Sequence, residues 1–209
     1  SMLSIGIPQD VWQTDFIDEF YQGYLSLANS FGIELIGGDV SKTPDKIVVD
    51  STVIGEVEKG EAKMRSGAQA GDLIFVTGRL GGAHAGLKLL ENGVKFKDSK
   101  AWQKSLISKQ LTPFPRLDVT STLTSLITSM IDISDGLSSD LGHICQASQV
   151  GAKIFADKIP LHKNLKNITK DFSEQLNFAL NGGEDFELLF TINPKKKFQK
   201  NFSRLEGFF

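Results

Sequence analysis

Carboxylates and glycines gather in three short segments of this 209-residue chain. The most distinctive segment, Ile-Asp-Ile-Ser-Asp-Gly-Leu at 131–137, places Asp132 and Asp135 between a predicted buried strand and a predicted helix. Carboxylates at the end of a strand, beside a helix N-terminus, are typical of phosphate and metal chemistry in α/β proteins. Asp132 and Asp135 could therefore share a hard cation, and Ser134 could reach a phosphate oxygen.

The same segment has two other interpretations. Asp135 could simply cap the helix, since aspartate is a preferred N-cap residue. A calcium-binding loop is disfavoured, because Gly136 comes one position too early and His143 stands where a bidentate glutamate belongs. Short acidic motifs often match by chance, so the segment alone leaves metal–phosphate binding and helix capping equally open.

Two further segments combine glycines with acids. Gly-Gly-Asp at 37–39 would let the backbone approach a bulky anion while Asp39 holds the accompanying cation. A glycine turn in which Asp39 bonds its own backbone is the competing interpretation. In the third segment, 182–187, three acids follow two glycines. Glu184 is best placed to point into a site, whereas Glu187 could equally be a solvated strand residue.

The composition excludes some partners. With a formal net charge of -2, the chain gives no reason to expect nucleic acid or an anionic membrane as a partner. No transmembrane run or signal sequence is evident. The single cysteine, Cys145, falls on the apolar face of a predicted helix, so we expect a core residue and no disulfide framework. These features favour a reducing cytoplasm.

Hydrophobic periodicity predicts the elements that position these segments. Strands are expected at residues 2–7, 33–36, 46–57, 73–77, 130–133, 151–155 and 188–192. Helices are expected at residues 15–32, 82–92, 102–111, 117–129, 137–145 and 172–180. The polar stretch 58–61 is the predicted domain boundary, which gives two α+β pieces at 1–60 and 61–209.

The order and wording of the motifs resemble bacterial thiamine-monophosphate kinase, a family of the aminoimidazole ribonucleotide synthase superfamily. The motifs that carry the resemblance are Gly37-Gly38-Asp39, Arg65-Ser66-Gly67-Ala68 with Gly71-Asp72, the segment 131–137, and Gly182-Gly183-Glu184-Asp185-Phe186-Glu187-Leu188-Leu189-Phe190-Thr191. The resemblance extends over residues 2–193. It implies a two-domain α+β fold with a partial N-terminal nucleotide-binding and dimerisation domain at 1–60. The C-terminal domain at 61–209 is expected to be a mixed sheet covered by helices.

By this resemblance, the chain would transfer the γ-phosphoryl group of ATP directly to thiamine monophosphate, giving thiamine diphosphate. The acids and glycines, without a nucleophile–base pair, suit phosphoryl transfer by positioning and metal charge neutralisation. The implied magnesium ligands are Asp39, Asp132 and Asp135. The implied ATP contacts are Tyr21, Gly38, Asp39, Arg65 and Ser134, and Glu184 is implied to face the thiamine phosphate. An intact enzyme is implied to be a homodimer with its site between the two domains.

Two departures from the family affect these expectations. The family's N-terminal part with further metal-binding aspartates has no counterpart, nor does the C-terminal segment that supplies an aromatic contact to the thiamine ring. We therefore expect a sequence cut at both ends. Val40-Ser41 also replaces two threonines common after Gly-Gly-Asp. The alternative function is a catalytically incomplete nucleotide- and metal-binding fragment. Sister enzymes that depend on cysteine are disfavoured by the position of Cys145, and the Glu184 segment favours the kinase.

Overall fold

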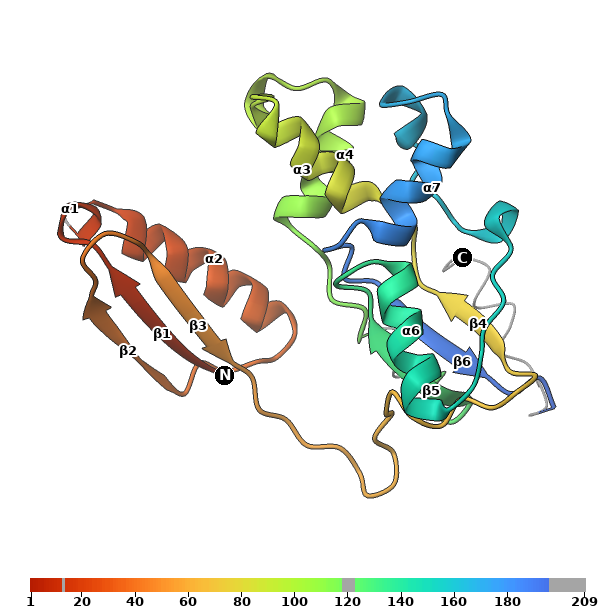
Figure 1. Ribbon diagram of the computed structural model, residues 1–209. Coiled ribbons are helices and arrows are strands. Elements are labelled where there is room, and N and C mark those ends of the chain that lie inside the picture. Colours follow the sequence, from red (N-terminus) through yellow and green to blue (C-terminus); the bar gives the residue numbers. More distant parts are fainter. Residues whose placement is uncertain (13, 118–122, 196–209) are drawn as a thin grey trace. The chain divides into compact units, whose positions relative to one another are not determined.

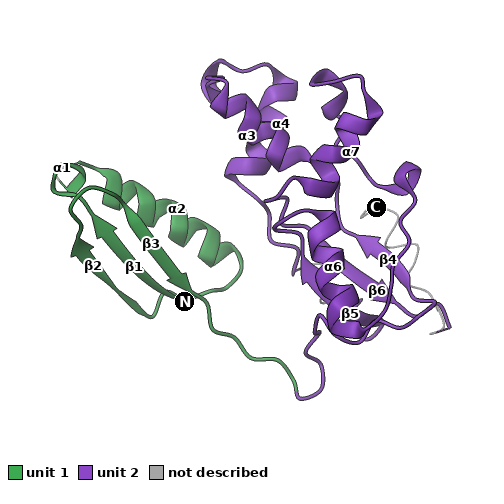
Figure 2. Ribbon diagram, viewed as in Figure 1, with its two compact units in different colours: residues 1–58 green, residues 59–209 purple. Residues whose placement is uncertain are grey.

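The computed structural model describes residues 1–12, 14–117 and 123–195. The chain folds as two compact units, residues 1–58 and residues 59–209, shown in Figures 1 and 2. Each unit has buried apolar residues of its own. Within the described ranges, no helix is both long enough and apolar enough to cross a membrane.

The first unit is a three-stranded sheet covered by a helix. Its elements are β1 (Met2–Ile7), α1 (Gln9–Trp12), α2 (Phe16–Ser30), β2 (Gly37–Lys42) and β3 (Val48–Thr52). The strand order is β2-β1-β3, with β2 parallel and β3 antiparallel to the central β1. The expected strand at 2–7 and the expected helix before Gly32 are both confirmed.

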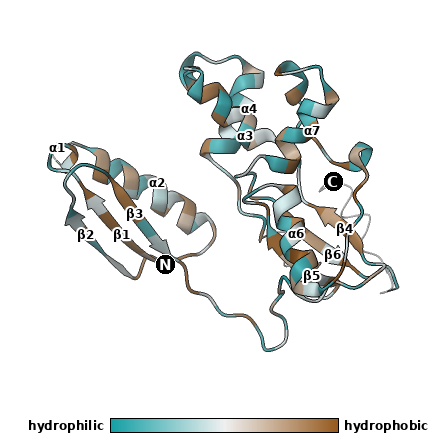
Figure 3. Ribbon diagram, in the orientation of Figure 1, coloured by the Kyte–Doolittle hydropathy of each residue, from teal (hydrophilic) through white to brown (hydrophobic). Residues whose placement is uncertain are grey.

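The core of this unit follows from two periodicities. Leu3, Ile5 and Ile7 alternate along β1 and are buried, as expected of a strand with one covered face. Apolar residues at helical spacing along α2 pack against them, and Figure 3 shows polar and apolar residues alternating along this helix. The main helix contacts are Phe16, Ile17, Phe20, Tyr21 and Tyr24.

The second strand of this unit differs from the sequence expectation. The strand expected at 33–36 is absent, and residues 37–42 pair with β1 instead, so the Gly-Gly-Asp motif lies within a strand rather than in a turn. Gly38 stands opposite Leu3, and a Cβ at position 38 would lie 1.8 Å from the Leu3 carbonyl oxygen. The glycine therefore allows two strand backbones to approach closely, a requirement that only the pairing reveals.

The second unit combines a small sheet with several helices (Figure 1). Its strands are β4 (Leu73–Val76), β5 (Ile127–Asp132) and β6 (Leu188–Ile192). Its α-helices are α3 (Gly82–Glu91), α4 (Ala101–Leu111), α6 (Leu137–Ser148) and α7 (Phe172–Asn181). Single 3₁₀ turns lie at η1 (Phe96–Asp98), η2 (Ala156–Lys158) and η3 (Leu165–Asn167).

The sheet of this unit has the order β4-β6-β5, and β6 pairs antiparallel with both neighbours. The sequence suggested a mixed sheet here, whereas the described pairings are antiparallel on both sides of the central strand. Helix α6 packs on the sheet through Leu137, Leu141 and Ile144. Helices α3, α4 and α7 share a second cluster that includes Leu106, Ile107 and Phe178. The expected α+β architecture is confirmed.

Two predicted elements of this unit are wrong. Residues 151–155 form no strand, although Ile154 and Phe155 line a groove of about 560 Å³ beside β4. Both side chains are exposed, at 37% and 56%, so this apolar stretch is neither paired nor buried. The helix expected at 117–129 ends too late, because β5 already begins at Ile127 and pairs with Ile192. Residues 118–122 of that expected helix lie outside the described residues.

Candidate functional site

The second unit brings two of the three acidic segments together. The Glu184 backbone N–H donates to the Ser134 carbonyl oxygen at 2.8 Å, and the Phe186 N–H donates to the Ile133 carbonyl oxygen at 2.9 Å. These bonds continue the β5–β6 pairing beyond Asp132, the last residue of β5. Asp132, Ser134, Asp135 and Glu184 therefore lie at one end of the sheet, with exposed carboxylates on all three acids.

Glycines allow this close approach. A Cβ at Gly183 would lie 2.5 Å from the Ser134 carbonyl oxygen. Gly136 has a φ of +111°, and its Cβ would lie 2.8 Å from the Leu180 carbonyl oxygen. Larger residues at these two positions would push the acidic segments apart, so the glycines of both motifs have a packing role.

Asp140, which the sequence did not single out, holds the loop in place. Its buried carboxylate accepts the backbone N–H groups of Asp135 and Gly136, both at 3.1 Å. Gly136, and not Asp135, is the N-cap of α6, and as a glycine it has no side chain that could accept a capping bond. The interpretation of Asp135 as a helix cap is therefore wrong, which leaves its carboxylate for other partners.

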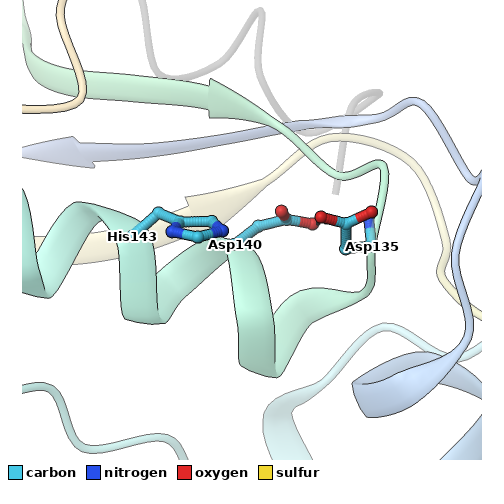
Figure 4. Close-up of side chains that lie close together, drawn as sticks. All are labelled: Asp135, Asp140 and His143. Atoms are coloured by element: carbon cyan, nitrogen blue, oxygen red, sulfur yellow. Dashed lines mark hydrogen bonds between the residues drawn. The ribbon is translucent and has the colours of Figure 1, made fainter.

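Asp135, Asp140 and His143 offer potential ligand atoms that all lie within 4.8 Å of one another (Figure 4). Burial raises the pKa of Asp140, and the nearby charges of Asp135 and Asp132 raise it further. The hydrogen bonds from the two backbone N–H groups lower this pKa, but the net effect is an increase. A bound cation would offset this mutual repulsion of carboxylates. Exposed carboxylate oxygens such as those of Asp135 suit magnesium, whereas the His143 nitrogen suits softer metals better. The three clustered residues do not include Asp132.

Glu184 is held in an unusual backbone conformation. Its φ of +67° is left-handed, which costs a non-glycine residue free energy and often marks a functional position. Its exposed carboxylate accepts a hydrogen bond from the Gln110 side-chain amide of α4. His84 of α3 lies nearby, and its pKa is lowered overall. Burial and the charge of Lys88 lower this pKa by more than the charges of Glu91 and Glu184 raise it. The contact with α4 was not predicted, since nothing local in the sequence links residues 110 and 184.

Asp185 has a structural role that the sequence analysis did not assign. It is 3% exposed, and its two oxygens accept the N–H groups of Gly81 at 2.5 Å and Ala83 at 3.0 Å. The carboxylate thus satisfies two orphan donors at the N-terminus of α3. Burial raises the pKa of Asp185 to about 6, although both N–H bonds lower it.

We expect this acid to make stability depend on pH. The folded-state pKa of about 6 lies above the ordinary value of 3.8, so the native state binds this proton more tightly than the unfolded state. The resulting stabilisation is present at pH 3.8 and below, and is lost as the pH rises through about 6. It amounts to about 3 kcal/mol.

The measurement is urea unfolding at several pH values between about 4 and 7, on the parent chain and on Asp185→Asn. Both carry Trp12→Phe, so that fluorescence reports on Trp102 of the second unit alone. The free energy of unfolding of the parent should fall relative to Asp185→Asn by more than about 2 kcal/mol across this range, which is most of the full effect. Parallel pH profiles for the two proteins would contradict the assignment.

Glu187 is not a solvated strand residue. It is 2% exposed, and its carboxylate accepts hydrogen bonds from Thr77 Oγ1 at 2.6 Å, Lys109 Nζ at 3.1 Å and Arg116 Nη1 at 3.1 Å. The open alternative in the sequence analysis is therefore decided in favour of burial. Glu187 ties β6 to β4 and to the chain that follows α4, which keeps the Glu184 segment in place.

Arg65 lies beside β5 in the same unit. The preceding Met64 carbonyl oxygen accepts the Met130 N–H at 2.9 Å, and the Arg65 carbonyl oxygen accepts a bond from Ser148 Oγ at 3.2 Å. The Arg65 side chain is exposed. Its segment thus follows the outer edge of the strand that ends at Asp132.

The first unit brings together the other three candidate residues. Tyr21 of α2 and Gly38 and Asp39 of β2 line one cavity of about 470 Å³. Asp39 is exposed, stands opposite Ser4 of β1 and accepts a hydrogen bond from Ser41 Oγ. An aromatic ring, a glycine backbone and a carboxylate around one cavity can bind a small phosphorylated ligand.

Known proteins with the same fold and related sequences include thiamine-monophosphate kinases. One from Buchnera aphidicola subsp. Schizaphis graminum is 42% identical over 92% of this chain, and the match spans 58% of that protein. A solved thiamine-monophosphate kinase structure from Stenotrophomonas maltophilia K279a is 33% identical, with a TM-score of 0.87, and the match covers 99% of this chain and 64% of that one. A structure described as AaThiL complexed with AMPPCP and TMP is 32% identical, with a TM-score of 0.81, over 94% of this chain and 62% of that one.

Family models account for both units. The model of the AIR synthase related protein, N-terminal domain, matches residues 1–57. The model of the AIR synthase related protein, C-terminal domain, matches residues 69–199. The chain spans somewhat more than half the length of the curated relatives it matches. On the two matches, which together cover most of its length, the chain belongs to the AIR synthase related protein family.

Proposed function

We propose that this chain acts in the ATP- and magnesium-dependent phosphorylation of thiamine monophosphate to thiamine diphosphate. The observation that carries the proposal is the bond between Glu184 N–H and the Ser134 carbonyl oxygen, which joins two acidic, glycine-containing segments at one end of a sheet. It is supported by relatives named thiamine-monophosphate kinase and by the related structure with AMPPCP, an ATP analogue, and TMP.

The residues of this chain would act by binding and orientation. Asp39, Asp132 and Asp135 are the proposed magnesium ligands, since magnesium prefers carboxylate oxygens together with substrate phosphates. Magnesium held there would neutralise phosphate charge. Tyr21, Gly38 and Asp39 would contact ATP in the cavity of the first unit. Arg65 and Ser134 would contact phosphate oxygens, because a guanidinium group matches phosphate geometry and a hydroxyl can donate to it.

Glu184 is the proposed contact to thiamine monophosphate. Its backbone is fixed by the bond to Ser134, while its carboxylate is exposed. A carboxylate repels a bare phosphate, so we infer that Glu184 acts on the metal-bound phosphate group or on the cationic ring of the substrate.

The proposed assembly of the intact enzyme is a homodimer in the cytoplasm. In the first unit, β2 and β3 expose apolar side chains that include Val40, Val48 and Val49. Both strands are edge strands of the sheet, and strand edges with exposed apolar side chains are typical sites of association, which supports pairing with a second copy. The single cysteine of the chain is compatible with a reducing compartment.

A second candidate is a nucleotide- and metal-binding fragment without turnover. The observation that favours it is the cavity lined by Tyr21, Gly38 and Asp39, which could hold a nucleotide without any transfer taking place. The two candidates differ in outcome, because the fragment would bind ATP and magnesium but form no thiamine diphosphate.

Glu184→Gln tests the proposed substrate contact. The substitution keeps the shape of the side chain and removes its charge, so the affinity for thiamine monophosphate should fall by about tenfold, while ATP affinity should change less than about twofold. Isothermal calorimetry with magnesium present measures both affinities. Glu174→Gln, at an exposed position of α7, is the matched control and should change neither. Equal losses for the two ligands would contradict the substrate role of Glu184.

A further inference from the structure

The backbone of Glu184 is fixed independently of its side chain. Its N–H donates to Ser134, and the next residue, Asp185, is anchored by the N–H groups of Gly81 and Ala83. These contacts determine where the Glu184 Cα lies. They leave the direction of the exposed carboxylate to whatever contacts it, because a glutamate side chain has several rotatable bonds.

The Gln110 amide contacts this carboxylate. Its Nε2 donates to one carboxylate oxygen of Glu184. Gln110 lies in the last turn of α4, which is held by the buried residues Leu106 and Ile107. The neighbouring Lys109 is tied to Glu187 at 3.1 Å. The amide therefore projects from a well-packed helix, whereas the carboxylate that it meets is an exposed side chain on the loop before β6.

The Gln110 amide is a neutral donor, which affects the charge balance around the Glu184 carboxylate. Lys109 and Arg116 both pair with the buried Glu187, each at 3.1 Å, so two cations of this region are engaged by that acid. Glu184 receives a hydrogen bond from an amide instead, which orients the carboxylate without neutralising it. The bond thus leaves an exposed acidic side chain on the loop whose backbone is bonded to Ser134.

The oxygen of the Gln110 side-chain amide also bears on the orientation of this group. Among the described residues, Gln110 Oε1 is buried and has no hydrogen-bond partner. An unsatisfied buried acceptor is costly, and such groups in native structures call for an explanation. The bond that the amide does make, to Glu184, then determines which way it faces.

We propose that Gln110 is a positioning residue that orients the Glu184 carboxylate toward thiamine monophosphate. The proposal rests on the proposed function, since it assigns Gln110 a role in binding that substrate. Gln110 itself need not touch the ligand. Its contribution is to restrict the carboxylate before binding, so that less conformational freedom is lost in the complex.

The test compares Gln110→Leu and Gln110→Glu with Gln146→Leu, a control at an exposed position of α6. Calorimetry with magnesium present measures the dissociation constants of thiamine monophosphate and of ATP. Gln110→Leu should weaken thiamine monophosphate about tenfold and ATP less than about twofold. Gln110→Glu should weaken thiamine monophosphate further, because a second carboxylate would repel Glu184. Gln146→Leu should change neither constant.

A double-mutant cycle separates positioning from a general structural effect. In a Glu184→Gln background, Gln110→Leu should cause little further loss of thiamine monophosphate affinity, since both changes remove the same oriented carboxylate. An additive loss, an equal loss for ATP, or unchanged affinity in Gln110→Leu would each overturn the proposal. If the parent chain binds ATP but no thiamine monophosphate, the proposed function fails and the positioning role with it. A cycle on urea stability then still reports separately whether the amide and carboxylate interact.

Discussion

Replacing Glu187 with leucine should lower the free energy of unfolding of the second unit by about 3 kcal/mol. The side chain is 2% exposed and receives bonds from Lys109, Arg116 and Thr77. Leucine fills much of the same space but leaves the Arg116 guanidinium, whose side chain is 15% exposed, without this carboxylate. The Lys109 side chain is 33% exposed and can turn partly toward water, which limits the loss.

The measurement is urea unfolding in the Trp12→Phe background, where Trp102 reports on the second unit. The matched control is Glu61→Gln, which breaks the more exposed Glu61–Lys63 pair at 3.8 Å and should cause little change. Equal stabilities of Glu187→Leu and the parent would show that the buried carboxylate does not hold α4 to the sheet.

Asp132→Asn should weaken magnesium-dependent ATP binding by about 100-fold, or about 2.7 kcal/mol. Asp132 is the last residue of β5, where its backbone pairs with Leu188 while its side chain is exposed. Asparagine preserves the pairing and the shape but removes the negative charge that a hard cation prefers. The fold should therefore be retained while the cation is lost.

Calorimetry with ATP in the presence and absence of magnesium checks this expectation. The difference between Asp132→Asn and the parent should disappear when magnesium is omitted. Asp157→Asn, at an exposed position of η2, is the control and should bind as the parent does. Equal affinity of Asp132→Asn and the parent with magnesium present would remove Asp132 from the metal site.

Local patterns predicted much of the fold because they reflect one face of one element. The alternation of Leu3, Ile5 and Ile7 predicted β1, and the helical spacing of Leu137, Leu141 and Ile144 predicted α6. Residues 151–155 have an equally apolar pattern but form no strand. A strand needs a partner for its backbone groups, and a sequence pattern alone does not identify that partner.

In the candidate site, too, the local motifs were predicted from the sequence, whereas the contacts between distant segments were not. The acidic motifs were recognisable from their residue sequences, and the order of these motifs along the chain resembles one family. The roles of Asp140, Asp185 and Gln110 were missed, because each depends on a contact that pattern and spacing do not encode. For Gly38 the sequence offered close approach to an anion or a glycine turn, whereas the structure shows a constraint from the Leu3 carbonyl of a neighbouring strand. Such constraints arise only when distant segments pair.

The central claim is phosphoryl transfer to thiamine monophosphate, and an assay of the product tests it most directly. The chain is incubated with ATP, magnesium and thiamine monophosphate, and thiamine diphosphate is measured by thiochrome fluorescence after chromatographic separation. We expect product with the parent chain, none without magnesium, and a large loss with Asp132→Asn. No product from a parent chain that binds both ATP and thiamine monophosphate would contradict the claim and favour the binding fragment.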